Sequence, residues 1–199
     1  LDGHLLPGLN PVGVPRSLKG TTLPFTYNQI NELEQLLANH DIGVIKMEVS
    51  RNVEPENGFL EKVRELATIN GIVLVFDECT SGFRETFGGL HKKYSVEPDM
   101  ALFGKAMGNG YAITAVIGRR EIMEAAQTTF ISSTFWTERI GPVAGLKTLE
   151  IMEREKSWEF ITATGKSIGE RWKQLAEKHE IPIRVFGHPA LIKFAIKSP

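Results

Sequence analysis

Cysteine is almost absent from this sequence, since Cys79 is the only one among 199 residues. A single cysteine excludes an internal disulfide and favours a cytoplasmic setting. The first residues, Leu1-Asp2-Gly3-His4, contain neither an initiator methionine nor the basic start of a signal peptide. We therefore expect no secretory leader, and the missing methionine indicates a chain that starts inside a longer protein.

Long apolar runs and an excess of one charge are missing as well. No apolar stretch approaches the roughly 18 residues that a membrane-spanning helix requires. Lys and Arg number 23 against 24 Asp and Glu, which gives a net charge of −1. This balance provides no electrostatic reason to expect a nucleic acid or an anionic membrane as partner.

Several well-known sequence motifs are also absent. The sequence contains no GxGxxG, no GxxxxGK(S/T) and no GxSxG. A nicotinamide-binding, P-loop or α/β-hydrolase function therefore lacks support. The five histidines show no metal-ligand spacing, and we interpret His91 and His188 as surface or loop residues.

What the sequence does contain is an alternation of helical and strand patterns after a Gly- and Pro-rich lead-in over residues 1–28. The expected order is a helix from Asn28 to about His40, a strand over Gly43–Val49, a helix from Phe59 closed by Asn70-Gly71, and a strand over Ile72–Phe76. The five consecutive apolar residues of this last strand indicate burial on both faces. Such alternation predicts an α/β fold with a mostly parallel sheet.

The second half of the chain continues the alternation and then changes. We expect strands over Met100–Phe103, Ala112–Ile117 and Phe130–Ser133, and helices over Arg120–Gln127, Gly141–Arg154 and Trp158–His179, followed by strands over Ile181–Val185 and Leu191–Ile196. The last two strands look like part of a different subdomain. The prediction is one large domain over residues 1–157 and the start of a smaller α+β domain over residues 158–199.

Two places in this pattern carry chemistry. Asp77 ends the buried strand, and ligands of open α/β sheets bind beyond the carboxyl ends of the strands. Lys105 follows the next strand and is flanked by Gly104 and Gly108, so a ligand can approach it closely, as Schiff-base chemistry requires. From the residues alone, the simpler interpretations are that Asp77 starts a polar loop and that Lys105 is a solvated loop lysine.

The motifs around these residues, taken together, resemble a known family. Val75-Phe76-Asp77-Glu78-Cys79-Thr80-Ser81-Gly82-Phe83-Arg84, then Phe87-Gly88-Gly89, Glu97-Pro98-Asp99 and Phe103-Gly104-Lys105-Ala106-Met107-Gly108-Asn109-Gly110, look like the signature of class III aminotransferases of fold type I. The Gly-Phe-Arg and Gly-Gly pieces are closest to the glutamate-1-semialdehyde 2,1-aminomutase subgroup. The similarity runs in one register from about Glu48 to about Glu153.

The resemblance implies pyridoxal 5′-phosphate (PLP) as cofactor and assigns roles to residues. Lys105 is then the Schiff-base lysine and proton carrier, and Asp77 pairs with the pyridine nitrogen. Cys79 packs under the cofactor ring, or is simply a small buried residue, and Thr80 lies near the phenolic oxygen. Glu48 matches the Glu of the family's Glu-Pro motif near the substrate, although Val49 replaces the proline, and a satisfied loop carboxylate is the alternative.

The resemblance also implies an assembly. Ser133 and Thr134 align with the Gly-Thr that reaches the PLP phosphate of the neighbouring subunit, so a homodimer with shared active sites is expected. The residues that follow, Phe135-Trp136-Thr137-Glu138-Arg139, depart from the family's Ser-Gly-Asn-Pro in the substrate pocket. Arg84, Arg119 and Arg120 are interpreted as exposed or structural charges, with a substrate carboxylate as the alternative.

Family members also carry a phosphate-binding loop and a PLP-stacking aromatic residue before the matched region. We find neither, so this chain is expected to be a fragment. Three functions remain open: amino-group transfer to a small keto, aldehyde or sugar-type substrate, the intramolecular transfer of the aminomutase, and a non-catalytic remnant that keeps only fold and association.

Overall fold

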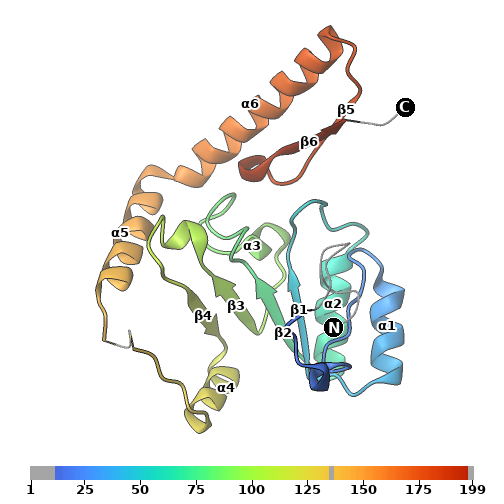
Figure 1. Cartoon of the computed structure of the whole chain (residues 1–199), viewed down its shortest axis with the longest axis vertical. Coiled ribbons are helices and arrows are strands. Elements are labelled where there is room, and N and C mark those ends of the chain that lie inside the picture. Colours follow the sequence, from blue (N-terminus) through green and yellow to red (C-terminus); the bar gives the residue numbers. More distant parts are fainter. Residues whose placement is uncertain (1–11, 135–136, 197–199) are drawn as a thin grey trace.

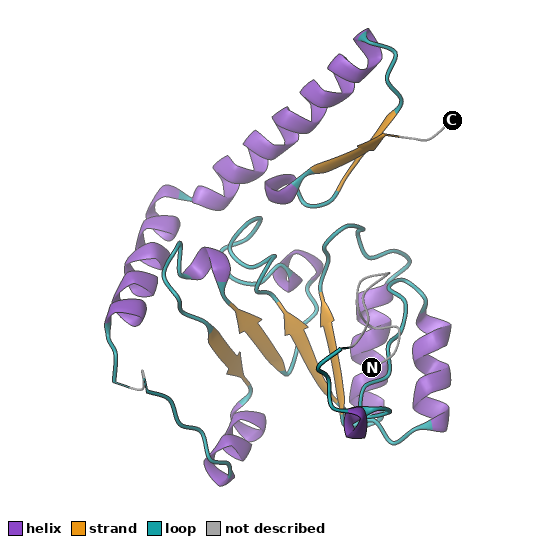
Figure 2. Ribbon diagram, in the orientation of Figure 1, coloured by secondary structure: helices purple, strands orange, loops and turns teal. Residues whose placement is uncertain are grey.

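The structure is a computed structural model that describes residues 12–134 and 137–196. Figure 1 shows an α/β body with a helix and a two-stranded sheet above it, and Figure 2 shows the same elements by type. The helices and strands are α1 (Ile30–Asn39), β1 (Val44–Glu48), α2 (Phe59–Ile69), β2 (Val73–Asp77), α3 (His91–Tyr94), β3 (Met100–Phe103), β4 (Ala115–Gly118), α4 (Arg120–Met123), α5 (Ile140–Glu155), α6 (Ser157–Lys178), β5 (Ile183–Phe186) and β6 (Lys193–Ile196), with 3₁₀ turns η1 (Arg16–Leu18), η2 (Lys105–Met107), η3 (Glu124–Thr128) and η4 (Pro189–Leu191).

The main sheet has the order β1-β2-β3-β4. The β1–β2 and β2–β3 pairs are parallel, whereas β4 runs antiparallel to β3. The α/β fold with a mostly parallel sheet is therefore confirmed, and the antiparallel strand is an addition that the sequence pattern did not predict. Within the described residues, none of the helices combines the length and the apolarity needed to cross a membrane.

One face of the sheet is covered by α1 and α2, which lie together beside β1 in Figure 1. Both helices turn an apolar stripe toward Ile45 and Met47 of β1 and Leu74 and Phe76 of β2, and these side chains form the main core. Because side chains alternate along a strand, the residues between them in β1 and β2 point to the opposite face. That face carries Lys46 and Asp77.

A second, smaller core lies under the turn that follows β3. Ala101, Phe103 and Met107 are buried there, and Leu149 of α5 packs against them. Gly145 faces this cluster from α5, where an added Cβ would lie 3.6 Å from Ile113 Cδ1 and 3.8 Å from the Met107 carbonyl oxygen. Helix α5 therefore buttresses the turn that contains Lys105.

The predicted strand over Phe130–Ser133 was wrong, because residues 130–133 belong to no helix or strand. The predicted helix over Arg120–Gln127 is a short α4 continued by the 3₁₀ turn η3. Helices α5 and α6 are separated by a single residue, Lys156, whose backbone is left-handed with φ 49° and ψ 45°. The domain boundary predicted at residue 157 stays a prediction.

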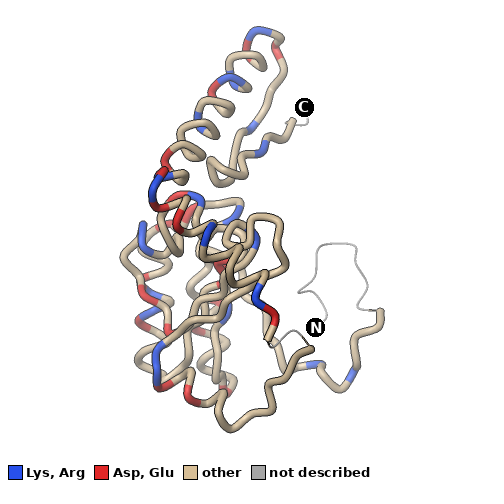
Figure 3. Tube along the Cα trace, turned by 90° about the vertical axis from the view of Figure 1, so that its left-hand side faces the viewer, with Lys and Arg blue, Asp and Glu red and all other residues tan. Residues whose placement is uncertain are grey.

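Helix α6 and the β5–β6 hairpin form a unit above the carboxyl ends of β1, β2 and β3 (Figure 1). Trp172 of α6 packs on Phe194 of β6 with ring centroids 5.2 Å apart. Gly165 lets α6 approach the hairpin closely, since an added Cβ would lie only 1.9 Å from the Pro189 carbonyl oxygen. Figure 3 shows Lys and Arg interleaved with Asp and Glu along α6 and the body of the described chain.

His188 fastens this unit to the body. Its side chain is 1% exposed, its Nδ1 lies 2.5 Å from Glu85 Oε1, and its Nε2 lies 2.9 Å from the Ser50 carbonyl oxygen. Lys193 Nζ adds a bond of 2.8 Å to Asn52 Oδ1. The interpretation of His188 as a surface or loop side chain was wrong, because the docking of the hairpin onto the loops after β1 and β2 removes it from solvent.

Burial alone would lower the pKa of His188, but the hydrogen bonds to Glu85 and to the Ser50 carbonyl together raise it above its ordinary value of 6.5. The same hydrogen bond from His188 lowers the pKa of Glu85 below 4.5 despite partial burial. The two shifts describe an ion pair between imidazolium and carboxylate. Glu54 and Lys93 also face this pair, and Lys93 Nζ lies 3.3 Å from Glu85 Oε2.

Replacing Gly165 tests the contact between α6 and the hairpin. We expect Gly165→Ala to lower the free energy of unfolding by about 2 kcal/mol, because the new methyl group overlaps a backbone carbonyl that cannot move without displacing η4. The matched control is Gly145→Ala in α5, where the methyl group meets only ordinary van der Waals contacts and should stabilise the helix by up to about 1 kcal/mol. Equal losses for both variants in urea unfolding would contradict the predicted contact.

Replacing His188 tests the ion pair. The raised pKa of His188 means that its contribution to stability is complete below pH 6.5 and is lost as the pH rises through the folded-state pKa. The lowered pKa of Glu85 means that its contribution is complete above pH 4.5 and is lost as the pH falls through the folded-state pKa. His188→Gln should therefore cost about 2 kcal/mol of unfolding free energy near pH 5.5, and less at pH 9. Urea unfolding at both pH values measures this, with exposed His179→Gln as control; a loss that does not depend on pH would refute the ion pair.

Candidate functional site

The candidate site lies where three strands end together. In the sheet register, Glu48 of β1 is the Cα partner of Asp77 in β2, and Asp77 is the partner of Leu102 in β3. Two residues after β3 comes Lys105. Since carboxyl ends of parallel strands meet at one edge of the sheet, the register brings Glu48, Asp77 and Lys105 to the same edge.

Asp77 accepts hydrogen bonds from Lys46 and from Cys79. Lys46 Nζ donates to Asp77 Oδ2 at 2.8 Å, and the backbone N–H of Cys79 donates to Oδ1 at 3.1 Å. Burial alone would raise the pKa of Asp77, but these hydrogen bonds and the charge of Lys46 together lower it. The carboxyl group is therefore ionised at neutral pH, as a partner of a cationic nitrogen must be.

Lys105 opens the turn η2 in a strained conformation. Its φ is +43°, in the left-handed region that non-glycine residues rarely adopt and that costs on the order of 1 kcal/mol. The side chain is exposed, and Nζ donates to Thr80 Oγ1 at 2.9 Å. The contact with Thr80 links the loops after β2 and β3.

Glycine keeps the Lys105 turn compact. At Gly108 an added Cβ would lie 2.3 Å from the Tyr111 carbonyl oxygen. At Gly104 it would lie 3.5 Å from Cys79 Sγ, so the Cys79 thiol sits against the backbone just before Lys105. Burial raises the pKa of Cys79, and the charge of Asp77 raises it further. Cys79 is therefore a neutral thiol between the carboxylate and the lysine loop.

A buried network under the site was missed by the sequence analysis. Glu78 has no exposed surface; its Oε1 lies 2.9 Å from His91 Nδ1, and its Oε2 accepts a hydrogen bond from the Ser81 hydroxyl. Burial alone would raise the pKa of Glu78, but these hydrogen bonds lower it. The interpretation of His91 as a surface residue was wrong, because its side chain closes this network. The contact with His91 had no local signal in the sequence, since His91 lies 13 residues from Glu78.

Arg84 supports the loop that carries Thr80. Its Nε donates to the Thr80 carbonyl oxygen at 2.7 Å, and its own carbonyl oxygen accepts a bond of 3.2 Å from Thr162 of α6. Burial lowers the pKa of Arg84. A structural charge was one of the two interpretations of Arg84, and this contact agrees with it. Arg84 and Thr80, each with a hydrogen bond on either side, thus connect α6 to Lys105.

Glu48 is only loosely held. Arg51 Nη1 lies 3.5 Å from Glu48 Oε1, and both side chains reach solvent. Glu48 and Asp77 are Cα partners on neighbouring strands, so their side chains point to the same face. The contact of Glu48 with substrate stays a prediction.

Ser133 and Thr134 are exposed and lie in the segment that joins η3 to α5. Figure 1 shows this segment running along the β4 side, away from the turn that follows β3. Phe135 and Trp136 lie outside the described residues. The structure does not bring Ser133 and Thr134 to Lys105 within one chain.

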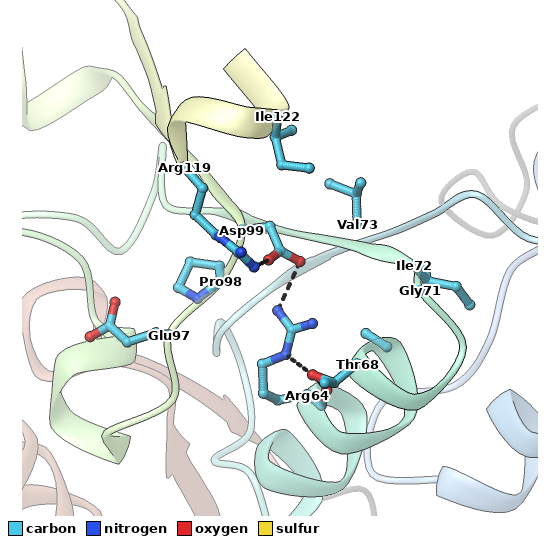
Figure 4. A pocket seen from close by; sticks show the side chains of 11 residues that line it. Arg64, Thr68, Gly71, Ile72, Val73, Glu97, Pro98, Asp99, Arg119 and Ile122 are labelled. Atoms are coloured by element: carbon cyan, nitrogen blue, oxygen red, sulfur yellow. Dashed lines mark hydrogen bonds and ion pairs between the residues drawn. The ribbon is translucent and has the colours of Figure 1, made fainter. Parts of the chain in front are cut away.

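A different cavity, of about 370 Å³, opens at the other end of the sheet (Figure 4). Asp99, just before β3, accepts bonds there from Arg64 at 2.9 Å, from Arg119 at 3.0 Å and from the Leu74 backbone at 2.8 Å. Burial alone would raise the pKa of Asp99, and these three donors lower it. Arg119 therefore has the structural role that was one of its two interpretations, and this cavity is not where the candidate residues gather.

Comparison with known proteins shows which family this chain resembles. The family described as Aminotransferase class-III matches residues 45–199. A 3-aminobutyryl-CoA aminotransferase from Cloacimonas acidaminovorans (strain Evry) is 39% identical over an alignment 186 residues long, and the match covers 89% of this chain and 45% of that protein.

Solved structures agree on the fold. An omega-transaminase from Sphaerobacter thermophilus superposes with a TM-score of 0.85 at 23% identity, over 94% of this chain and 45% of that one. The FumI protein of Sphingopyxis sp. MTA144, in its PLP internal aldimine form, gives a TM-score of 0.83 at 23% identity, over 87% and 44% of the two chains. The chain thus spans less than half the length of each of these three proteins. On the family match and the curated relative together, this chain belongs to the class III aminotransferases.

Proposed function

We propose that the protein carrying this sequence transfers amino groups with PLP, and that Lys105 and Asp77 are its catalytic residues. The observation that carries the proposal is that an accessible amine and an ionised carboxylate follow or end neighbouring parallel strands at the same edge of the sheet in a class III chain. The names of the FumI structure and the omega-transaminase support the cofactor and the reaction class.

The residues present fit the cofactor. Asp77 offers a carboxylate to a ring nitrogen, and Lys105 Nζ is exposed and donates to the Thr80 hydroxyl. Cys79, against the backbone of Gly104, provides a small uncharged surface beneath a ring. Thr80 would lie near the phenolic oxygen, and Ser133 and Thr134 of a neighbouring subunit would reach the phosphate. When bound, PLP supplies an aldehyde that condenses with amines and a ring that accepts electron density.

The chain's own groups then have defined tasks. Asp77 holds a proton at the ring nitrogen, because its lowered pKa keeps the carboxylate charged. Lys105 Nζ would hold the cofactor and, as a free amine, would move a proton to and from the amine-bearing carbon of the substrate. Thr80 Oγ1, 2.9 Å from Nζ, orients the amine, and Arg84 orients Thr80.

For the substrate, we propose a small keto or aldehyde acceptor. The curated relative bears the name of an aminotransferase, which favours transfer between two molecules over transfer within one. A sugar-type acceptor and the intramolecular reaction of glutamate-1-semialdehyde 2,1-aminomutase are the alternatives, the latter because the Gly-Phe-Arg and Gly-Gly pieces resemble that subgroup. A strict requirement for a separate amino acceptor would distinguish transferase from mutase, and binding of PLP with no turnover would indicate a non-catalytic remnant.

The catalytic assignment predicts the behaviour of two variants of the intact protein. Lys105→Ala should abolish borohydride-dependent labelling of this turn by PLP and reduce turnover by at least about a thousandfold, because it removes the amine assigned to the Schiff base. Asp77→Asn should retain PLP but reduce turnover by a similar factor, because a neutral amide does not hold the ring proton. Peptide mass spectrometry and steady-state kinetics measure these effects, with exposed Asp41→Asn as control. Normal labelling and turnover of Lys105→Ala would refute the assignment.

The shared site predicts complementation between subunits. In a homodimer whose sites take Lys105 from one chain and Thr134 from the other, a mixed dimer of Lys105→Ala and Thr134→Ala subunits contains one intact site. Mixing the two impaired variants under conditions of subunit exchange should therefore restore activity. Analytical ultracentrifugation checks the dimer, and an active monomer or the lack of any restoration would exclude shared sites.

A further inference from the structure

Lys46 contacts the carboxylate that the proposed function assigns to the cofactor, yet it has no task in that function. Its Nζ lies 2.8 Å from Asp77 Oδ2, and the two side chains are 55% and 22% exposed. Lys46 is paired in register with Val75, so it reaches Asp77 diagonally across the sheet from β1 to β2.

The sheet explains why a cation is needed here. Glu48 lies directly opposite Asp77, and like charges at facing positions of neighbouring strands repel each other. Arg51 accompanies Glu48 at 3.5 Å, and Lys46 accompanies Asp77 at 2.8 Å. Without the cofactor, Lys46 is therefore the group that balances the charge of Asp77.

When the cofactor binds, Lys46 and the ring nitrogen compete for the carboxylate of Asp77. The Cys79 backbone already donates to Oδ1, and Lys46 donates to Oδ2. A protonated ring nitrogen that approaches Asp77 brings a second positive charge to within a few ångströms of Nζ. The two cations repel each other, and at an effective dielectric constant of about 20 this repulsion amounts to several RT. Ring binding then has to displace Lys46 or share Asp77 with it.

We infer that Lys46 is a placeholder counter-ion, which neutralises Asp77 in the cofactor-free protein and competes with the ring nitrogen of PLP for that carboxylate. The inference rests on the proposed function for its second half only, since the ion pair with Asp77 exists without the cofactor. A purely supporting role, in which Lys46 holds Asp77 ready for the ring, predicts the opposite effect on cofactor affinity.

The decisive variant is Lys46→Met in the intact protein, compared with Lys46→Arg, which keeps the charge. If Lys46 is a placeholder counter-ion, Lys46→Met should bind PLP about three- to tenfold more tightly, because the competing charge is gone. Lys46→Arg, which keeps that charge, should bind PLP like the original protein. The gain should vanish for the 1-deaza analogue of PLP, in which a C–H group replaces the ring nitrogen. It should vanish also in an Asp77→Asn background, where no charge remains to compete for. Equilibrium titrations followed by absorbance give the dissociation constants of the original protein and of each variant for PLP and for the analogue.

A second measurement needs no cofactor. Thermal unfolding of the cofactor-free protein should show a lower midpoint for Lys46→Met than for exposed Lys62→Met on α2, because only the former leaves Asp77 without its cation. A Lys46→Met protein that binds PLP equally or less tightly overturns the competition. An unchanged midpoint overturns the ion pair. If the original protein does not bind PLP at all, the proposed function fails, and with it the competition, while the unfolding result still decides whether Lys46 balances Asp77.

Discussion

The candidate site depends on the register of three parallel strands. Because side chains alternate along a strand, a shift of β1 against β2 by one residue would turn Lys46 and Glu48 toward the α1–α2 core and Ile45 and Met47 toward solvent. The apolar side chains of the core therefore fix the register that places Glu48 opposite Asp77. The positions of the chemical groups follow from burying Leu74 and Phe76.

Beyond the strand ends, polar groups rather than apolar packing fix the loops. Two sets of hydrogen bonds hold the loop after β2. One joins Glu78 to His91 and Ser81, and the other joins Glu85 to His188. A buried charge is costly unless it is paired, so each of these contacts penalises any other loop conformation. The loop gains a defined shape, and Thr80, between the two networks, keeps its hydroxyl next to Lys105.

The fold was predictable because its signals are local. An apolar run that ends in Asp77, and a lysine between glycines after the next strand, placed two residues at one sheet edge before any contact was known. The buried partners were not predictable, because His188 lies 103 residues from Glu85 and Lys46 lies 31 residues from Asp77. The residues that flank a histidine or lysine in the sequence do not show that it will form an ion pair with a distant carboxylate, or that it will be buried. The strand expected over Phe130–Ser133 failed for a related reason, since β-branched and aromatic residues form a strand only where a neighbouring strand accepts their hydrogen bonds.

The single residue between α5 and α6 has a mechanical consequence. With 22 residues, α6 is a rigid arm about 33 Å long, so a change of about 10° at Lys156 would move its far end by about 6 Å. The φ and ψ angles of one residue do not fix the direction of so long a helix by themselves. The contacts of Thr162 with Arg84 and of His188 with Glu85 lie away from that pivot and act as braces, which fix the direction of the arm as well as its attachment.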